Sequence, residues 1–334
     1  MILITGGNGF LGQALIGYFK GRYRQDAKSK QAPPRHGWLH YNYDLPNHSI
    51  IWPDPWSPQA GSLYQMACAH NGVEMDDNII RGDLEDKIKK SFIVIHAAAV
   101  ANLNESEKDK IKNHRINVEG TINVGRLCAK HKKPLVFIST CCLYGTCLPG
   151  ARITEDAEPR PTEVYAESKL EAERELMDMA GKTWKLWKRN GLKLSICRMG
   201  TMYGPGMRKE LFNYMALDAV AKGTYVAVHG TGNQTRQYLY IDDAVSGIGK
   251  VMDAEFKGEI YNICGGASIS VGTTLEVAMK IVGNRANINY IEDRNGQIEF
   301  QNISSHKLEW LGWTRQTSYE MGMRKTFAWM KRAR

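Results

Sequence analysis

A glycine-rich turn near the start of the chain constrains the fold more than any other feature. The sequence ITGGNGFLGQALI places Gly6, Gly9 and Gly12 at three-residue intervals, directly after the apolar run MILIT. Helical apolar periodicity follows in FLGQALIGYFKGRY. Glycine lets the backbone turn tightly and approach a pyrophosphate, whose charge the helix N-terminus stabilises. The strand–loop–helix order therefore predicts a dinucleotide-binding turn, in which Phe10 and Leu11 join the glycines at the cofactor.

The segments after this turn alternate between apolar runs and helical stretches. The runs GWLHYNY, NIIRGD, FIVIHAAA and LVFIST read as strands. Continuous apolar strands between helices indicate a parallel sheet covered on both faces. We therefore expect an α/β chain with a Rossmann-type, doubly wound parallel sheet. An NAD(P)-binding domain would span 1–175, with strands near 192–204 and 258–264 rejoining it, and a smaller substrate-binding lobe would occupy most of 176–334.

Composition excludes several classes of protein. No apolar run in the 334 residues approaches the ~18 needed to cross a bilayer, so we expect no membrane association. The chain shows no secretory leader pattern, which predicts a cytoplasmic location with reduced thiols. The seven cysteines include no C-x-x-C pair, so no metal site is expected. The net charge of +9 is spread along the chain and indicates a solvated surface rather than a nucleic-acid site.

The end of the second predicted strand bears on the choice of cofactor. WLHYNYDLP offers Asp44, whose carboxylate would accept both adenosine ribose hydroxyls and repel a 2′-phosphate. This favours NAD. The distance from the glycines exceeds the usual ~20 residues, and Arg35 stands just before the strand, so NADP stays possible.

Tyr165 and Lys169 stand four residues apart in TEVYAESKLEAE. On a helix, that spacing puts both side chains on one face. An isolated pair of this kind is usually part of a solvated helix. A tyrosine hydroxyl has a reference pKa near ~10 and becomes a useful base only beside a cation. The remainder of the chain decides between these interpretations.

Further segments follow the glycine turn in a characteristic order: RGDLED, VIHAAA, NVEGTINV, FISTCCLYG, RMGTMYGPG, GTGNQTRQYLYIDDAV and YNICGG. Thr140 lies four residues before Tyr144 and 25 before Tyr165. With these motifs the chain resembles, over almost its whole length, the extended short-chain dehydrogenase/reductase family. It is most similar to the NAD-dependent nucleotide-sugar epimerases and dehydratases.

The resemblance implies a cofactor site and a substrate site. The cofactor residues would be Asp83 and Leu84 at the adenine, Ala97, Ala98 and Ala99 along the cofactor, Asn117 as support, and Tyr165 and Lys169 at the nicotinamide ribose. The substrate, a nucleotide-diphosphate sugar, would meet Thr140, Cys141, Thr201, Lys209 and Arg236, the last of these at the diphosphate. Related enzymes commonly form homodimers, which we expect here.

The resemblance also implies the first chemical step. Lys169 and oxidised nicotinamide would lower the pKa of Tyr165, which then takes a proton from a sugar hydroxyl. Thr140 would hydrogen-bond the same oxygen while the carbon's hydride passes to NAD.

The outcome after that step depends on residues where the chain departs from the family. Dehydratases have an acidic pair after the catalytic Thr, whereas this chain has Cys141 and Cys142. That difference favours a 4-epimerase, which needs no further acid or base. A 3,5-epimerase would instead use a Cys142 thiolate, with Lys209 near the position where its partner acid would sit, although a buried packing role for Cys142 competes with this.

Three further functions stay open: a dehydratase, a keto-sugar reductase, and a non-catalytic NAD(P)- or nucleic-acid-binding protein. Thr201 stands where the family usually has Asn, which leaves the preferred nucleotide and sugar open.

Overall fold

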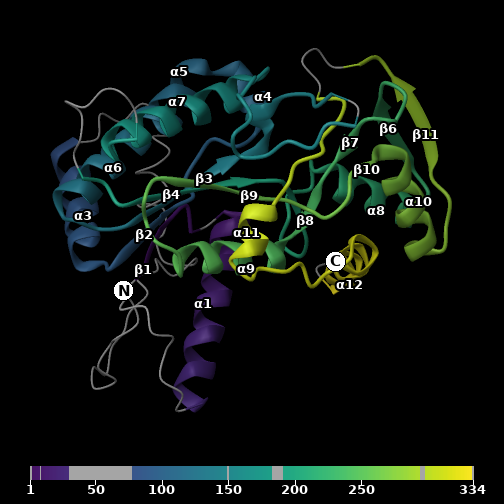
Figure 1. Ribbon diagram of the computed structural model, residues 1–334. Coiled ribbons are helices and arrows are strands. Elements are labelled where there is room, and N and C mark those ends of the chain that lie inside the picture. Colours follow the sequence, from purple (N-terminus) through teal and green to yellow (C-terminus); the bar gives the residue numbers. More distant parts are fainter. Residues whose placement is uncertain are drawn as a thin grey trace. The chain divides into compact units, whose positions relative to one another are not determined.

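The computed structural model describes residues 2–7, 9–29, 77–148, 150–182, 191–293 and 298–332 (Figure 1). The predicted strand GWLHYNY and Asp44 lie outside the described residues. The chain forms two compact units, and each is described separately. The first comprises 1–139, 164–197 and 251–260, and the second comprises 140–163, 198–250 and 261–334. Residues 140–163 thus belong to the second unit, whereas the sequence placed them in the first domain.

The first unit alternates strands and helices along the chain. Its elements are β1 (Ile2–Thr5), α1 (Phe10–Ser29), α3 (Asp77–Lys90), β2 (Ile93–His96), α4 (Leu103–Lys108), α5 (Lys110–His114), a π-helix (Arg115–Glu119), α6 (Gly120–Lys130), β3 (Leu135–Thr140), α7 (Val164–Met179) and β4 (Leu194–Met199). Strand β9 (Glu259–Ile263) completes its sheet.

The sheet has the strand order β1-β2-β3-β4-β9, and β1, β2 and β3 pair in parallel. Its strands are continuous apolar runs because both faces are covered. On one face α6 and α7 lie side by side, with Val124, Cys128 and Leu176 in the same buried cluster as Phe137 of β3 (Figure 1). The parallel sheet with flanking helices confirms the predicted Rossmann-type fold.

The prediction of a strand at NIIRGD is wrong, because these residues lie in helix α3. Leu84 and Ile88 stand four apart on one face of this helix, and both pack into the core. The pairs Glu85–Lys89 and Asp86–Lys90 have the i, i+4 spacing that supports a helix. The short β-branched run of NIIRGD precedes such a pattern and therefore becomes part of the helix. Asp83 consequently lies within a helix, and its side chain is outside the described part of the structure.

The described residues of the second unit form helices and three two-stranded sheets. Its elements are a 3-10 turn (Cys141–Tyr144), β5 (Thr201–Tyr203), α8 (Phe212–Lys222), β6 (Tyr225–His229), β7 (Thr235–Arg236), β8 (Tyr238–Tyr240), α9 (Ile241–Met252), β10 (Ile269–Ser270), α10 (Val271–Val282), β11 (Asn287–Ile291), α11 (His306–Trp310) and α12 (Tyr319–Arg332). The strand pairs are β5 with β8, β6 with β11, and β7 with β10.

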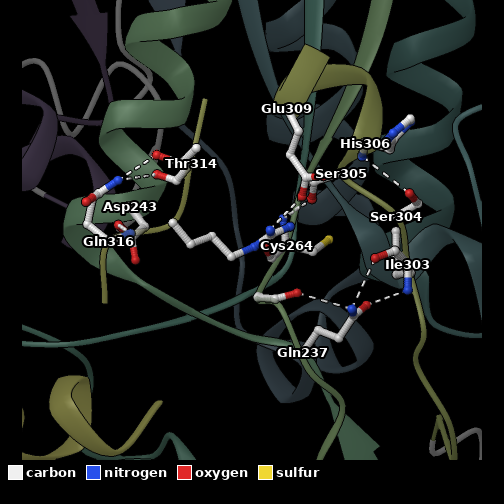
Figure 2. Close-up of polar contacts among 12 residues, drawn as sticks. Gln237, Asp243, Cys264, Ile303, Ser304, Ser305, His306, Glu309, Thr314 and Gln316 are labelled. Carbon is white, nitrogen blue, oxygen red and sulfur yellow. Dashed lines mark hydrogen bonds and ion pairs between the residues drawn. The ribbon is translucent and has the colours of Figure 1, made fainter. Parts of the chain in front are cut away.

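A network of polar contacts anchors the segment after β9 to the C-terminal part of the second unit (Figure 2). The Gln237 side chain donates to the carbonyl oxygens of Gly265 and Ile303 and accepts from the Ile303 N–H. The Cys264 N–H donates to Ser305 Oγ at 2.9 Å, and Arg315 Nε donates to the Cys264 carbonyl at 2.7 Å. Cys264 is therefore held at both its backbone groups.

Candidate functional site

The glycine turn has the tight geometry that the sequence predicts. Gly6 adopts a positive φ of 74°, and its carbonyl accepts the Gly9 N–H at 3.0 Å. A side chain at Gly12 would overlap the Gly6 carbonyl and approach Gly7 Cα to 2.7 Å. The first turn of α1 therefore packs directly on the loop, and backbone N–H groups at such a helix start suit a pyrophosphate. Leu11 is buried and Phe10 is half-buried.

The segment after β2 adjoins this turn. The Ala97 N–H donates to the Thr5 carbonyl at 3.3 Å, and a Cβ on Gly6 would lie 2.7 Å from Ala98 N. Because the nearest atoms are backbone, the contact requires glycine at position 6. Ala97 and Ala99 are half-buried, whereas Ala98 is 6% exposed. The predicted cofactor residues of the two segments come together in the structure.

Asn117 lies at the centre of the π-helix, a form that is frequent at functional sites. Its Oδ1 accepts the Val100 N–H at 2.8 Å. Its Nδ2 donates to the Val100 carbonyl and to Ser168 Oγ, each at 3.1 Å. This fully buried amide therefore links the segment after β2 to helix α7, an arrangement that suits the supporting role predicted for Asn117.

Tyr165 and Lys169 lie in the first two turns of α7, and the Val164 N–H at its start donates to Glu107 Oε1 at 3.2 Å. Tyr165 is half-buried, whereas Lys169 is only 1% exposed. The Lys169 ammonium stands 4.3 Å from the centroid of the Phe137 ring. Burial lowers the pKa of Lys169 to about 7, and the charge of Glu173 opposes that shift.

The buried Lys169 ammonium is suited to a polar ligand. It makes a cation–π contact with Phe137. An ammonium has three donors, and buried donors need acceptors. Ribose hydroxyls would supply such acceptors, so this side chain and the glycine turn both fit a nicotinamide dinucleotide.

The predicted substrate residues lie in the second unit. Thr140 ends β3, and its Oγ1 accepts the Cys142 N–H at 3.1 Å. Cys141 is 1% exposed, and its Sγ donates to the Arg198 carbonyl at 3.2 Å. The same sulfur lies 3.2 Å from the Cys264 sulfur. The thiol of Cys141 is therefore occupied by packing contacts and is not available to a substrate.

Cys142 is half-buried beside Thr140. Burial raises the pKa of its thiol, and the nearby carboxylate of Glu163 raises it further. The hydrogen bond with Thr140 and the positive charge of Arg236 act in the opposite direction and are outweighed. The thiol form therefore predominates at neutral pH, whereas a general base would need the thiolate.

The other predicted substrate residues are distributed over the second unit. The Arg236 guanidinium donates from Nη1 to the carbonyls of Thr235 and Ile298, at 2.8 and 2.6 Å, and its charge acts on Cys142. Thr201 is half-buried at the start of β5, opposite Tyr238 of β8. Lys209 is exposed in a turn.

Sequence reasoning missed several residues that support the cofactor side. Phe137 lies under Lys169, and His96 and Thr121 connect the glycine turn to Asn117. One signal was present: His96 is a polar residue at the end of an otherwise apolar run, where a buried ring needs hydrogen-bond partners.

The described part of the chain offers neither a metal centre nor a membrane crossing. Within it, no cluster of three or more histidine, cysteine, aspartate or glutamate residues is arranged to hold a metal ion. Its helices also lack the combination of length and apolar character that a membrane crossing requires.

Comparison with known proteins identifies the family. The family model for the NAD dependent epimerase/dehydratase family matches residues 2–264. A dTDP-D-glucose 4,6-dehydratase from Dictyostelium discoideum is 28% identical over 388 residues, covering 100% of this chain and 82% of that protein. A Methanocaldococcus jannaschii protein provisionally named a UDP-glucose 4-epimerase is 27% identical, covering 99% of this chain and 98% of that protein.

A solved structure has the same fold. The UDP-glucose 4-epimerase of Thermotoga maritima, determined with UDP-glucose, superposes with a TM-score of 0.78 at 20% identity, with 99% of each chain covered. The matched family model spans the glycine turn, the Asn117 amide and the Tyr165–Lys169 pair. The chain therefore belongs to the NAD-dependent epimerase/dehydratase family and is an NAD-dependent enzyme of that family.

Proposed function

We propose that this enzyme is a nucleotide-sugar 4-epimerase that works through a transient keto-sugar. The observation that carries the proposal is the state of the two residues after Thr140. Cys141 is buried with its thiol engaged by Arg198 and Cys264, and burial keeps Cys142 as a thiol. Neither residue supplies the acid and base that loss of water requires, whereas 4-epimerisation needs only a reversible hydride transfer.

Each proposed catalytic residue has a defined task. Tyr165 takes the proton from the sugar hydroxyl and later returns it. Lys169, through its positive charge, favours the tyrosinate form. Thr140 donates a hydrogen bond to the same sugar oxygen and so orients it. When bound, NAD would supply the hydride acceptor for the oxidation and the hydride donor for the return step. Arg236 offers its remaining guanidinium donors to the diphosphate.

A panel of UDP-, GDP-, dTDP- and CDP-hexoses incubated in D2O tests this proposal. We expect one sugar to give a stereoisomer of unchanged mass without deuterium, measured by mass spectrometry and anomeric NMR. Hydride returning to the carbon it left exchanges nothing with solvent. Tyr165→Phe should abolish this turnover while NAD binding persists, which assigns the reaction to this site. Turnover that survives in Tyr165→Phe contradicts the proposed base.

A 4,6-dehydratase is the second candidate, and a specific observation favours it. The carboxylate of Glu163 lies close enough to Cys142 to raise the pKa of that thiol. Glu163 therefore offers an acidic group beside the pair of cysteines, where the dehydratases have their own acidic residues. The two candidates differ in mass: a product lighter by one water, lost in Glu163→Gln, would establish dehydration.

Cys142→Ala separates 4-epimerisation from the 3,5-epimerase mechanism. We expect kcat to stay within roughly threefold of wild type, because the Cys142 thiol is not ionised and 4-epimerisation needs no second base. Cys142→Ser is the matched variant that keeps a small polar side chain. A loss of about 100-fold or more in Cys142→Ala, together with deuterium in the wild-type product, would make Cys142 a catalytic base.

Two more functions have their own signatures. A keto-sugar reductase would consume external NAD(P)H in proportion to product, whereas an epimerase recycles its cofactor. A non-catalytic protein would bind NAD without changing any sugar in the panel.

A further inference from the structure

A chain of hydrogen bonds runs through the first unit from the residue before the glycine turn to Asn117. Thr5, the last residue of β1, places its Oγ1 2.6 Å from His96 Nδ1. His96 Nε2 lies 2.9 Å from Thr121 Oγ1 on α6. Thr121 Oγ1 in turn donates to the carbonyl of Asn117 at 2.7 Å. His96 is 4% exposed, and Thr121 and Asn117 are fully buried, whereas Thr5 is half-buried. Water therefore does not reach the links between His96, Thr121 and Asn117.

The hydrogen-bond pattern fixes the state of the His96 ring. The single hydroxyl proton of Thr121 is donated to Asn117, so Thr121 can only accept from His96 Nε2–H. Burial lowers the pKa of His96 to about 3, and the charge of Lys169 adds to that shift, so the ring is neutral. Its Nδ1 is then an acceptor, and the Thr5 hydroxyl donates to it. Of the two neutral tautomers, only the Nε2–H form satisfies both partners.

The chain of hydrogen bonds connects the two predicted halves of the cofactor site. At one end, Thr5 immediately precedes Gly6, and its Oγ1 accepts the Ala98 N–H at 3.4 Å. At the other end, the Asn117 side chain donates to Ser168 Oγ at 3.1 Å, and Ser168 donates to the Tyr165 carbonyl at 2.8 Å. The glycine turn and the first turn of α7 are thereby joined through one imidazole.

The direction of these bonds restricts what the chain can do. It begins at a backbone N–H and ends at a backbone carbonyl, so it cannot carry a net proton to or from the site. A linear set of oriented hydrogen bonds does hold its members at fixed separations, and each bond polarises the next. The imidazole also stacks on the Phe137 ring, with centroids 5.9 Å apart and planes at 21°. Phe137 in turn makes the cation–π contact with the Lys169 ammonium.

We propose that His96 is a positioning residue for NAD binding. Its neutral ring, protonated at Nε2, acts as a spacer that fixes the position of the glycine turn relative to Asn117 and α7. The ring touches neither cofactor nor substrate in this role. It acts through Thr5 at one end and Thr121 at the other. This inference rests on the NAD dependence of the family and is independent of which sugar is converted.

Thr121→Val tests the spacer by removing the acceptor of His96 Nε2–H while nearly preserving side-chain volume. We expect the Kd for NAD, measured by titration calorimetry on the full chain, to rise about tenfold. Thr121→Ser keeps the hydroxyl and should restore the Kd to within about twofold of wild type.

Val124→Ala is the matched structural control. Val124 lies on the same helix, is 3% exposed and belongs to the core cluster, yet makes no link in the hydrogen-bond chain. Its Kd for NAD should stay within about twofold of wild type even though denaturant unfolding shows a stability loss. If Val124→Ala weakens NAD binding as much as Thr121→Val at equal stability loss, the role of the chain is only structural and the proposal is overturned.

A spectroscopic measurement on the wild-type protein keeps the proposal testable if Thr121→Val does not fold. The ¹⁵N chemical shifts of His96, assigned by comparison with His96→Gln, should report the neutral Nε2–H tautomer, unchanged between about pH 5 and pH 8. An Nδ1–H tautomer, a protonated ring or a mixture in rapid exchange would contradict the spacer. A result that contradicts the spacer does not affect the 4-epimerase proposal, because the sugar panel measures the stereochemistry and mass of the product.

Discussion

Lys169→Met is expected to lower kcat roughly 10²- to 10⁴-fold and at the same time to stabilise the NAD-free protein. The Lys169 ammonium is 1% exposed, and burial lowers its pKa to about 7. Its desolvation opposes folding, and the nearby charge of Glu173 offsets this only in part. Methionine fills a similar volume without charge, so we expect the free energy of unfolding at pH 7 to rise by about 2 kcal/mol.

The pH dependence of this gain follows from the direction of the pKa shift. Between the folded pKa of about 7 and the reference value of 10.5, the unfolded chain holds the Lys169 proton that the folded protein has lost. Wild-type stability therefore rises through this window, and the burial cost is fully present below it. The advantage of Lys169→Met should be largest at and below pH 7 and should shrink toward pH 10.5, as measured by urea unfolding.

The exposed Lys89 on α3 provides the control. Lys89→Met removes an equal charge from a solvated position and should change stability by less than about 0.5 kcal/mol at any of these pH values. If Lys169→Met is destabilised at pH 7, or if its difference from wild type does not vary with pH, the ammonium does not carry the burial cost described above.

Gly12→Ala should abolish measurable NAD binding, with the Kd raised at least roughly 100-fold. The added Cβ would overlap the Gly6 carbonyl and approach Gly7 Cα to 2.7 Å. Both are backbone atoms, so the loop itself must move away from α1, and the N–H groups offered to the pyrophosphate move with it. Overpacking of this kind also costs about 1–3 kcal/mol of stability. Calorimetric titration with NAD and denaturant unfolding measure the two effects.

Gly17→Ala is the matched control on the same helix. Gly17 is exposed, and a Cβ there meets nothing within 4 Å. Alanine in an unobstructed helical position is expected to stabilise the protein by about 0.5–1 kcal/mol and to leave NAD binding unchanged. Wild-type NAD affinity in Gly12→Ala would show that the turn does not need its close contact with α1.

Local patterns predicted the cofactor turn and most of the sheet. The glycine spacing after MILIT predicted a strand, a tight turn and a helix, which are β1, the turn at Gly6 and α1 in the structure, because a tight turn leaves few choices besides glycine. The apolar runs that became β2, β3, β4 and β9 were recognised because strands buried on both faces must be apolar throughout. The strand prediction for NIIRGD was wrong because this run is short. Helix α3 begins before the run and includes it.

The sequence by itself determined the order in which the chain presents the family's motifs, and it predicted which residues would meet the cofactor. Only the tertiary structure decided what each buried polar group contacts. Cys141 and Cys264 are far apart in the chain yet have sulfurs 3.2 Å apart, and this contact occupies the buried Cys141 thiol. Likewise, His96 becomes a neutral spacer only because Thr5 and Thr121, from two distant segments, converge on its ring. Hydrogen-bond partners and desolvation depend on distances in space, which spacing along the chain does not encode.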